Sequence, residues 1–393
     1  SSSATLPIDP ARGEAMQLAR RAIHLDPNLG DAYAAMGFVN LQDKKSAPFY
    51  RKAVELSPQR PEYHRWLATS LSEQDRFDEG IEEYRRTVQI DPLWYINYEH
   101  LAGALAYIGR YDESHRIASQ FLRLSSDDRA KLLLLRALAE DEGRVADALR
   151  YTRAIYERSP DERLSRFYYA SAAAQIGELQ RARSLMASDR LVSALLRSDW
   201  SAFARLAENF GHNFWERSDL WEASTMLVAT GHSDVILRLY DGARALIDAD
   251  SIDIERVAQP PAIMALARAG RTQEANRLLR IFAIKTRKLP ADGLGGERRQ
   301  INEAYIAAFA GRKDEALKRL DAISRQHPMA LSTIPVMSVR NNPFLQSLRN
   351  DPRLAAVDER LRAAVNAERK KAGLPLIDEV AWISDPKTLL TKN

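Results

Sequence analysis

The residues of this chain that could carry out chemistry are few and scattered. There is no cysteine, which excludes disulfides, thiol nucleophiles and Cys-based zinc or iron–sulfur sites. The seven histidines are His24, His64, His100, His115, His212, His232 and His327. No two of them are three or four residues apart, so no helix face presents two imidazole ligands to a metal. We therefore expect neither a metal site nor a cofactor.

Motifs for covalent or phosphate chemistry are also missing. The sequence contains no Gly-x-Ser-x-Gly and no Gly-x-x-x-x-Gly-Lys-Ser/Thr. The run Gly293-Leu294-Gly295-Gly296 follows no predicted strand, so we expect it to lie in a flexible loop over residues 288–296. With no catalytic residue to name, we expect the chain not to be an enzyme.

The elements that position the side chains are predicted by an internal repeat. Proline follows an acidic or serine residue at Pro27, Pro58, Pro92 and Pro160, each time after a helical stretch. Pro58 and Pro92 are 34 residues apart, Pro92 and Pro160 twice that, and Pro27 and Pro58 are 31 apart. An apolar spacing of three or four residues runs between these markers, which is the period of a helix. A repeat of this length is typical of stacked helix–turn–helix units.

A second pattern recurs in the middle of each unit. A glycine or polar turn is followed by an acidic residue and then by a small residue. The stretches are Asp75–Gly80, Gly109–Ser114, Gly143–Ala148, Gly177–Ala182, Gly270–Ala275 and Gly311–Ala316. Glycine suits the left-handed turn that ends a first helix, and the acidic residue suits the start of a second helix. These stretches resemble the tetratricopeptide repeat (TPR) family.

This resemblance implies an all-α fold, a right-handed TPR superhelix (α-solenoid) of roughly eight helical hairpins with an irregular middle and a C-terminal helical cap. We expect residues 1–10 to be a disordered or extended start, 11–188 an N-terminal TPR array and 189–216 an irregular helical insert. Residues 217–328 are then a C-terminal TPR-like array, and 329–393 a capping helix and tail. A chain that begins Ser-Ser-Ser-Ala-Thr also leads us to expect a fragment or processed form.

In a TPR array the first helices line the concave side, where peptides or partner helices bind. By register, the groove-facing residues are Arg65, Thr69, Glu99, His100, Tyr107, Phe167, Tyr168, Ser171, Trp221, Thr225 and Tyr305. The aromatic residues Tyr107, Phe167, Tyr168 and Trp221 are the expected anchors. The alternative is that some of them pack between neighbouring repeats. The family's carboxylate clamp uses a Lys and an Asn where this chain has Ala34 and Phe38, which argues against that function.

Charge and hydropathy narrow the range of partners. The net charge of +4 is small, and the basic clusters 285–288, 298–299 and 369–371 are short, so we expect no nucleic-acid partner. No run of 18 apolar residues occurs, so we expect no membrane insertion. The absence of cysteine is compatible with any compartment and slightly favours the periplasm over the cytoplasm. The ends of a repeat array can pair, so a homodimer is an alternative to a monomer.

Two segments depart from the repeat. Residues 189–215 concentrate Trp200, Phe203, Phe210, Phe214 and Trp215. The alternatives for this segment are a functional insert, with an enzymatic site as one form of it, and a degenerate repeat. Residues 342–354, with Asn-Pro-Phe-Leu and Asp-Pro-Arg-Leu, are similar to the segment that closes TPR regions of bacterial membrane-tethered regulators such as CadC-like activators and TPR-bearing adenylate cyclases. We expect a scaffold that binds a protein or peptide partner. The alternative is the ligand-sensing region of a larger bacterial signalling protein.

Overall fold

The computed structural model describes residues 10–40, 46–197, 199–216, 218–248, 254–331, 339 and 342–377. Helices and their connecting turns account for the regular structure of these residues, and no strand occurs among them. The prediction of an all-α fold built from helical hairpins is therefore confirmed. The chain divides into two compact units, one of residues 1–134 and 242–256 and the other of residues 135–241 and 257–393.

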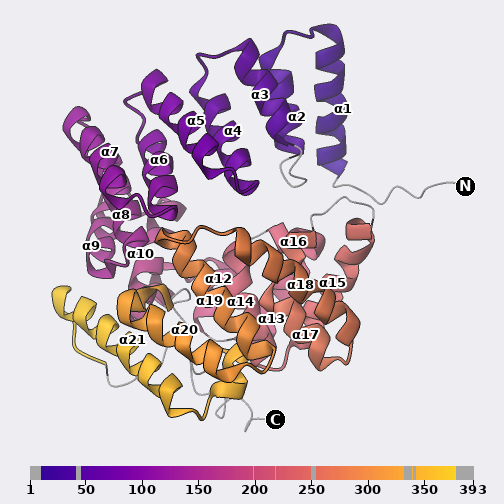
Figure 1. Cartoon of the computed structure of the whole chain (residues 1–393). Coiled ribbons are helices and arrows are strands. Elements are labelled where there is room, and N and C mark those ends of the chain that lie inside the picture. The colour runs from indigo at the N-terminus through magenta and orange to yellow at the C-terminus, as the bar shows by residue number, and fades with distance from the viewer. Residues whose placement is uncertain are drawn as a thin grey trace, which may run out of the picture. The chain divides into compact units, whose positions relative to one another are not determined.

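The first unit is a row of helical hairpins. Its helices are α1 (Pro10–Leu25), α2 (Gly30–Val39), α3 (Ser46–Leu56), α4 (Pro61–Glu73), α5 (Phe77–Ile90), α6 (Tyr95–Tyr107), α7 (Tyr111–Leu124) and the first half of α8 (Asp128–Asp141). Helices α1 to α7 pack in chain order, each against the next, as Figure 1 shows in indigo and purple. The core lies between the helices, where the completely buried rings of Tyr98 and Phe121 have centroids 5.0 Å apart.

The turns inside the hairpins have the backbone conformation that the sequence predicts. Glycines at the predicted positions have positive φ, for example 84° at Gly109. Where the first stretch has no glycine, Asp75 adopts the same left-handed conformation with φ 62°. After the turn, the N–H of Arg110 donates to the Leu105 carbonyl at 2.8 Å. This bond reaches back over the last helical turn and satisfies a carbonyl that the helix end leaves free.

The small residue after each turn allows the two helices of a hairpin to approach closely. At Gly80 in α5, a Cβ atom would lie 2.9 Å from the Ala68 carbonyl oxygen and 2.7 Å from Ser72 Oγ, both on α4. Ala148 and Ala316, at the matching positions of later hairpins, are completely buried. A larger side chain at these positions would push the hairpin open, because a packed interior cannot absorb added volume.

The second unit continues with longer and shorter helices. They are α9 (Val145–Arg158), α10 (Arg163–Gln175), α11 (Leu179–Leu185), α12 (Arg190–Leu196), α13 (Trp200–Glu208), η2 (Gly211–Glu216), α14 (Ser218–Ala229), α15 (Ser233–Asp248), α16 (Ile254–Val257), α17 (Pro260–Arg268), α18 (Thr272–Lys288), α19 (Gly293–Phe309), α20 (Lys313–Gln326), η3 (Pro328–Leu331), η5 (Pro343–Leu348) and α21 (Pro352–Lys371). Of these, α15 from residue 242 onward and α16 up to residue 256 belong to the first unit. The irregular segment has two short α-helices and a 3₁₀ turn. Its aromatic residues Trp200, Phe203, Phe214 and Trp215 are buried and form core.

One expectation about this unit is wrong. The run from Gly293 to Gly296 is the first turn of α19 and not part of a flexible loop. Gly295 and Gly296 are buried, and a Cβ atom at Gly296 would lie 2.4 Å from the Ala291 carbonyl oxygen. Glycine is needed at position 296 because the preceding backbone runs against the helix start, a close approach that no side chain would allow.

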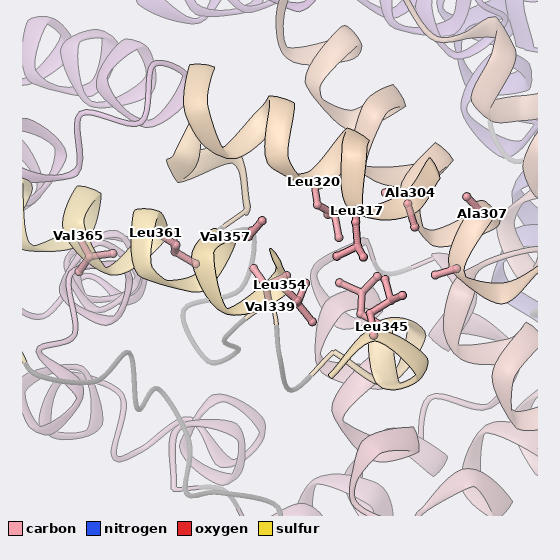
Figure 2. Packing of buried hydrophobic residues seen from close by; sticks show 13 residues of the cluster. Ala304, Ala307, Leu317, Leu320, Val339, Leu345, Leu354, Val357, Leu361 and Val365 are labelled. Atoms are coloured by element: carbon pink, nitrogen blue, oxygen red, sulfur yellow. The ribbon is translucent and has the colours of Figure 1, made fainter. Parts of the chain in front are cut away.

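The last helix, α21, covers the α19–α20 hairpin. Figure 2 shows Leu354, Val357, Leu361 and Val365 of α21 in one cluster with side chains of α19 and α20, and all four are buried. An array of repeats needs such a cap, because its last hairpin would otherwise expose an apolar face.

The other end of α21 lies against α9 and the turn before α11. Arg369 is only 4% exposed; its Nη1 donates to the Ile176 carbonyl at 2.5 Å and its Nε to the Pro375 carbonyl at 2.6 Å. Glu368 accepts a 2.9 Å hydrogen bond from the N–H of Ala146. A carboxylate is favoured there, because the first turn of a helix has free N–H groups and a positive end of the dipole.

Candidate functional site

The residues predicted to face a groove fall into a group in each compact unit. In the first unit, α4 supplies Arg65 and Thr69, and α6 supplies His100. The hydroxyl of Thr69 donates to the Arg65 carbonyl at 3.0 Å and lies 2.9 Å from the phenol oxygen of Tyr84. Since the only proton of Thr69 is used on the carbonyl, Tyr84 donates to Thr69. Tyr84, on α5, thus contacts α4 through this hydrogen bond, and it contacts α6 through the ring of His100.

Aromatic stacking completes this group. The guanidinium of Arg65 lies 4.4 Å from the ring centroid of Trp94, which precedes α6. The ring of His100 stacks on Tyr84, with centroids 5.5 Å apart and planes 6° from parallel. Both contacts are of the kind that holds a flat side chain in place while one face or edge stays accessible. We call Arg65, Thr69, Tyr84, Trp94 and His100 the α4–α6 cluster.

The α4–α6 cluster carries one positive charge. Packing around the His100 ring, and then the charge of Arg65, lower the pKa of His100, although part of its side chain remains exposed. Burial also raises the pKa of the Tyr84 phenol, so Tyr84 stays neutral. Arg65 is thus the charged member, and its Nη1 is buried with no hydrogen-bond partner among the described residues. A buried donor without an acceptor is unfavourable, and such atoms call for a water, an ion or a ligand group nearby.

The second unit brings together a smaller group on α8 and α10. The guanidinium of Arg136 lies 4.1 Å from the ring centroid of Tyr168 and forms an ion pair with Glu140. Phe167, beside Tyr168, packs against the apolar cluster of α10, α11 and α12. Ser171, one turn further along α10, is half-buried. Tyr168 is therefore held by a stacked cation, whereas Phe167 contributes to packing.

The structure places the remaining predicted residues apart from these groups. Glu99 and Tyr107 are half-buried on α6, and the Tyr107 ring packs on Phe77. Thr225 is buried in α14. Tyr305 packs on Phe344 and accepts a 2.8 Å hydrogen bond from Asn342, so the chain's own C-terminal segment contacts it. The side chain of Trp221 lies outside the described residues.

Sequence reasoning missed two members of the α4–α6 cluster. Tyr84 fits the apolar pattern of a second helix, so the sequence indicates only a core residue. Trp94 stands in the Asp-Pro-Leu-Trp turn that separates repeats. The signal that could have found it is its position one residue before a first helix, since side chains there can fold back over the preceding first helix.

Both groups consist of aromatic rings, guanidinium groups and hydroxyls. Stacked rings, guanidinium groups and hydroxyls recognise shape, carbonyls and carboxylates. Within the described ranges, no group of three His, Asp or Glu residues could hold a metal ion. Among those same residues, no helix is both long and apolar enough to cross a bilayer.

Comparisons with known proteins agree with the repeat. Residues 138–188 match a family model described as tetratricopeptide repeat. These residues contain the end of α8, all of α9 and α10, and α11. No curated protein matches the chain in sequence.

Solved structures with helical repeats are also similar in part. YrrB, described as a TPR protein with an unusual peptide-binding site, is 14% identical, covers 48% of this chain and 97% of its own, and has a TM-score of 0.29. The human IFIT1 dimer with PPP-AAAA is 16% identical, covers 76% of this chain and 72% of its own, and has a TM-score of 0.36. Residues 138–188 are thus similar to a tetratricopeptide repeat, and the helical hairpins on either side of them share the same turn conformation.

Proposed function

We propose that this chain is a non-catalytic scaffold that binds an extended segment of a protein partner along the first helices of its repeats. The observation that carries this proposal is the α4–α6 cluster. Three side chains on two successive first helices are held in place by stacking and hydrogen bonds, and His100 remains exposed. Side chains fixed before binding lose little conformational entropy when a ligand arrives.

The cluster favours a peptide that offers hydrogen-bond acceptors. Arg65 is charged, His100 is neutral with its ring nitrogens able to donate and accept, and Trp94 has an indole N–H donor. A backbone carbonyl or a carboxylate side chain of a partner would supply what the buried Nη1 of Arg65 lacks. The Arg136–Tyr168 pair repeats this combination of guanidinium and ring on the first helices of the second unit.

A peptide selection tests the proposal. Dodecapeptides displayed on phage would be selected on the full chain, and the affinity of a synthetic copy of the best one measured by fluorescence polarisation. We expect the variant Arg65→Gln with His100→Ala to lose at least about tenfold in affinity, since a residue at the centre of an interface commonly contributes about 2 kcal/mol.

The matched control is Arg86→Gln with His24→Ala. Both residues are exposed in the same unit and lie outside the cluster. This control should keep the parent affinity within a factor of two, and both variants should keep the parent helicity in circular dichroism. Selection that enriches no peptide, or equal affinity of both variants, would contradict the proposed groove.

A further inference from the structure

An open hollow of about 650 Å³ lies at the short hairpin of α12 and α13. Its lining includes residues 190, 193 and 194 of α12 with residue 197 just after it, and residues 202, 205 and 206 of α13 with residue 209 just after it. Each set has the spacing of one helix face. Ala194 and Ala202 are among the small side chains that line it. Its size is within the range of pockets that hold small molecules.

The core of the segment fixes the two helices around this hollow. On α13, Trp200, Phe203 and Ala207 are buried and face the interior of the unit, and the hollow lies on the opposite face of the helix. Each helix also begins with a side-chain cap. Asp189 accepts from the N–H of Val192 at 3.1 Å, and Asp199 accepts from the N–H of Ala202 at 2.9 Å. Caps of this kind hold a short helix that would be unstable alone.

Three arginines line the hollow, together with the acidic residues Asp199 and Glu208. Arg190, Arg197 and Arg205 are exposed, and none of their guanidinium groups forms an ion pair or hydrogen bond within the described part of the chain. The two acidic residues that line the hollow form hydrogen bonds with other groups of the chain. Asp199 caps α13, and Glu208 accepts a 2.6 Å hydrogen bond from Arg238.

Some arginines of the same unit are paired. Arg271 forms ion pairs with Glu274 and Asp241, and Arg238 with Glu208 and Asp234. Three like charges around one hollow repel one another, and a low-dielectric wall strengthens the field they produce. A bound anion would offset the repulsion among these three arginines.

We propose that the α12–α13 hollow is a binding site for a multiply charged oxyanion, either polyphosphate or polycarboxylate. The planar guanidinium presents two parallel N–H donors that match the oxygens of a carboxylate or phosphate, and three of them around one hollow suit a ligand with two or more such groups. A free small molecule and an acidic stretch of a protein share this chemistry. The site is separate from the α4–α6 cluster and does not depend on the proposed peptide function.

Isothermal titration calorimetry of the full chain at low salt tests this site with three probes: pyrophosphate, citrate and a tetraglutamate peptide. We expect saturable binding of at least one probe. The variant Arg190→Gln, Arg197→Gln, Arg205→Gln should weaken it at least about tenfold, because each lost guanidinium removes a charged, bidentate contact. Binding of pyrophosphate or citrate supports a small-molecule ligand, and binding of tetraglutamate alone supports an acidic protein segment.

Two further variants separate the site from general charge. Arg20→Gln, Arg21→Gln, Arg123→Gln removes the same charge from exposed arginines elsewhere, and it should keep affinity within a factor of two. Ala202→Leu narrows the hollow and keeps every charge, and it should also weaken binding. No saturable binding of any probe, or equal loss in both arginine variants, would overturn the proposal, as would unchanged affinity in the Ala202→Leu variant.

Discussion

The regular hairpins α4–α7 and the short hairpin α12–α13 differ in how some of their charged residues are paired. In α4–α7 several charges are paired: His64 lies 2.6 Å from Glu83, and Arg85 pairs with Glu113 of the next hairpin. In α12–α13 three arginines surround a hollow and the acids beside them are used elsewhere. The Arg85–Glu113 pair joins two neighbouring hairpins, so it contributes to the stacking of repeats. In the irregular segment, Arg190, Arg197 and Arg205 have no such partner among the described residues.

Both regions should depend equally on their aromatic core, and this is the largest effect we expect. Phe121 and Phe203 are completely buried. Phe121→Ala and Phe203→Ala should each cost about 3–5 kcal/mol, because truncation removes apolar contact and leaves a cavity. Hydrogen exchange followed by mass spectrometry should show faster exchange in 95–124 for the first variant and in 190–216 for the second. Unchanged protection of 190–216 in Phe203→Ala would mean that the short hairpin is not organised by its core.

The paired charge at His64 should make the first region pH-dependent. Burial lowers the pKa of His64, but the hydrogen bonds to Glu83 and to the Pro58 carbonyl outweigh it and raise the pKa above the ordinary value. Both ring nitrogens face acceptors, at 2.6 Å and 3.0 Å, so the doubly protonated ring satisfies both. The stabilisation is fully present below about pH 6.5, the unfolded-state pKa. It is lost as the pH rises through the higher folded-state pKa.

A proton NMR titration of His64 measures this shift. We expect Glu83→Gln to lower the pKa of His64, because the charge that favours the protonated ring is removed. The control is Glu82→Gln, which lies on the same helix but pairs with Arg85. If His64 has the same pKa in both variants, the contact with Glu83 does not stabilise its protonated ring.

The smallest effects concern the turns of the regular region. Asp75 has φ 62° where the next hairpin has Gly109 with φ 84°. Asp75→Gly should raise the free energy of unfolding and Gly109→Ala should lower it, each by about 0.5–1 kcal/mol, because only glycine adopts the left-handed conformation without strain. Thermal unfolding by circular dichroism compares the two. A stabilised Gly109→Ala variant would show that the turn conformation is not the one described.

Much of the local structure could be predicted because it depends on neighbouring residues. The turn glycines, the small residues after them and the start of α17 at Pro260 follow from backbone rules that act over a few residues. The α19 start at Gly293 could not be predicted in this way. A glycine run indicates a loop unless one knows that the Ala291 backbone packs against it.

The sequence by itself determined the helical period, the hairpin turns and the lack of catalytic motifs, since each depends on residues that are close together along the chain. Only the tertiary structure decided which charges are paired and which are not. Arg238 and Glu208 are 30 residues apart, and Arg369 meets the Ile176 carbonyl 193 residues earlier in the chain. Periodicity brings such residues to a helix surface, but packing of distant helices selects the partner. For that reason the sequence indicates Arg190, Arg197 and Arg205 only as ordinary surface residues, and the fold makes them the lining of one hollow.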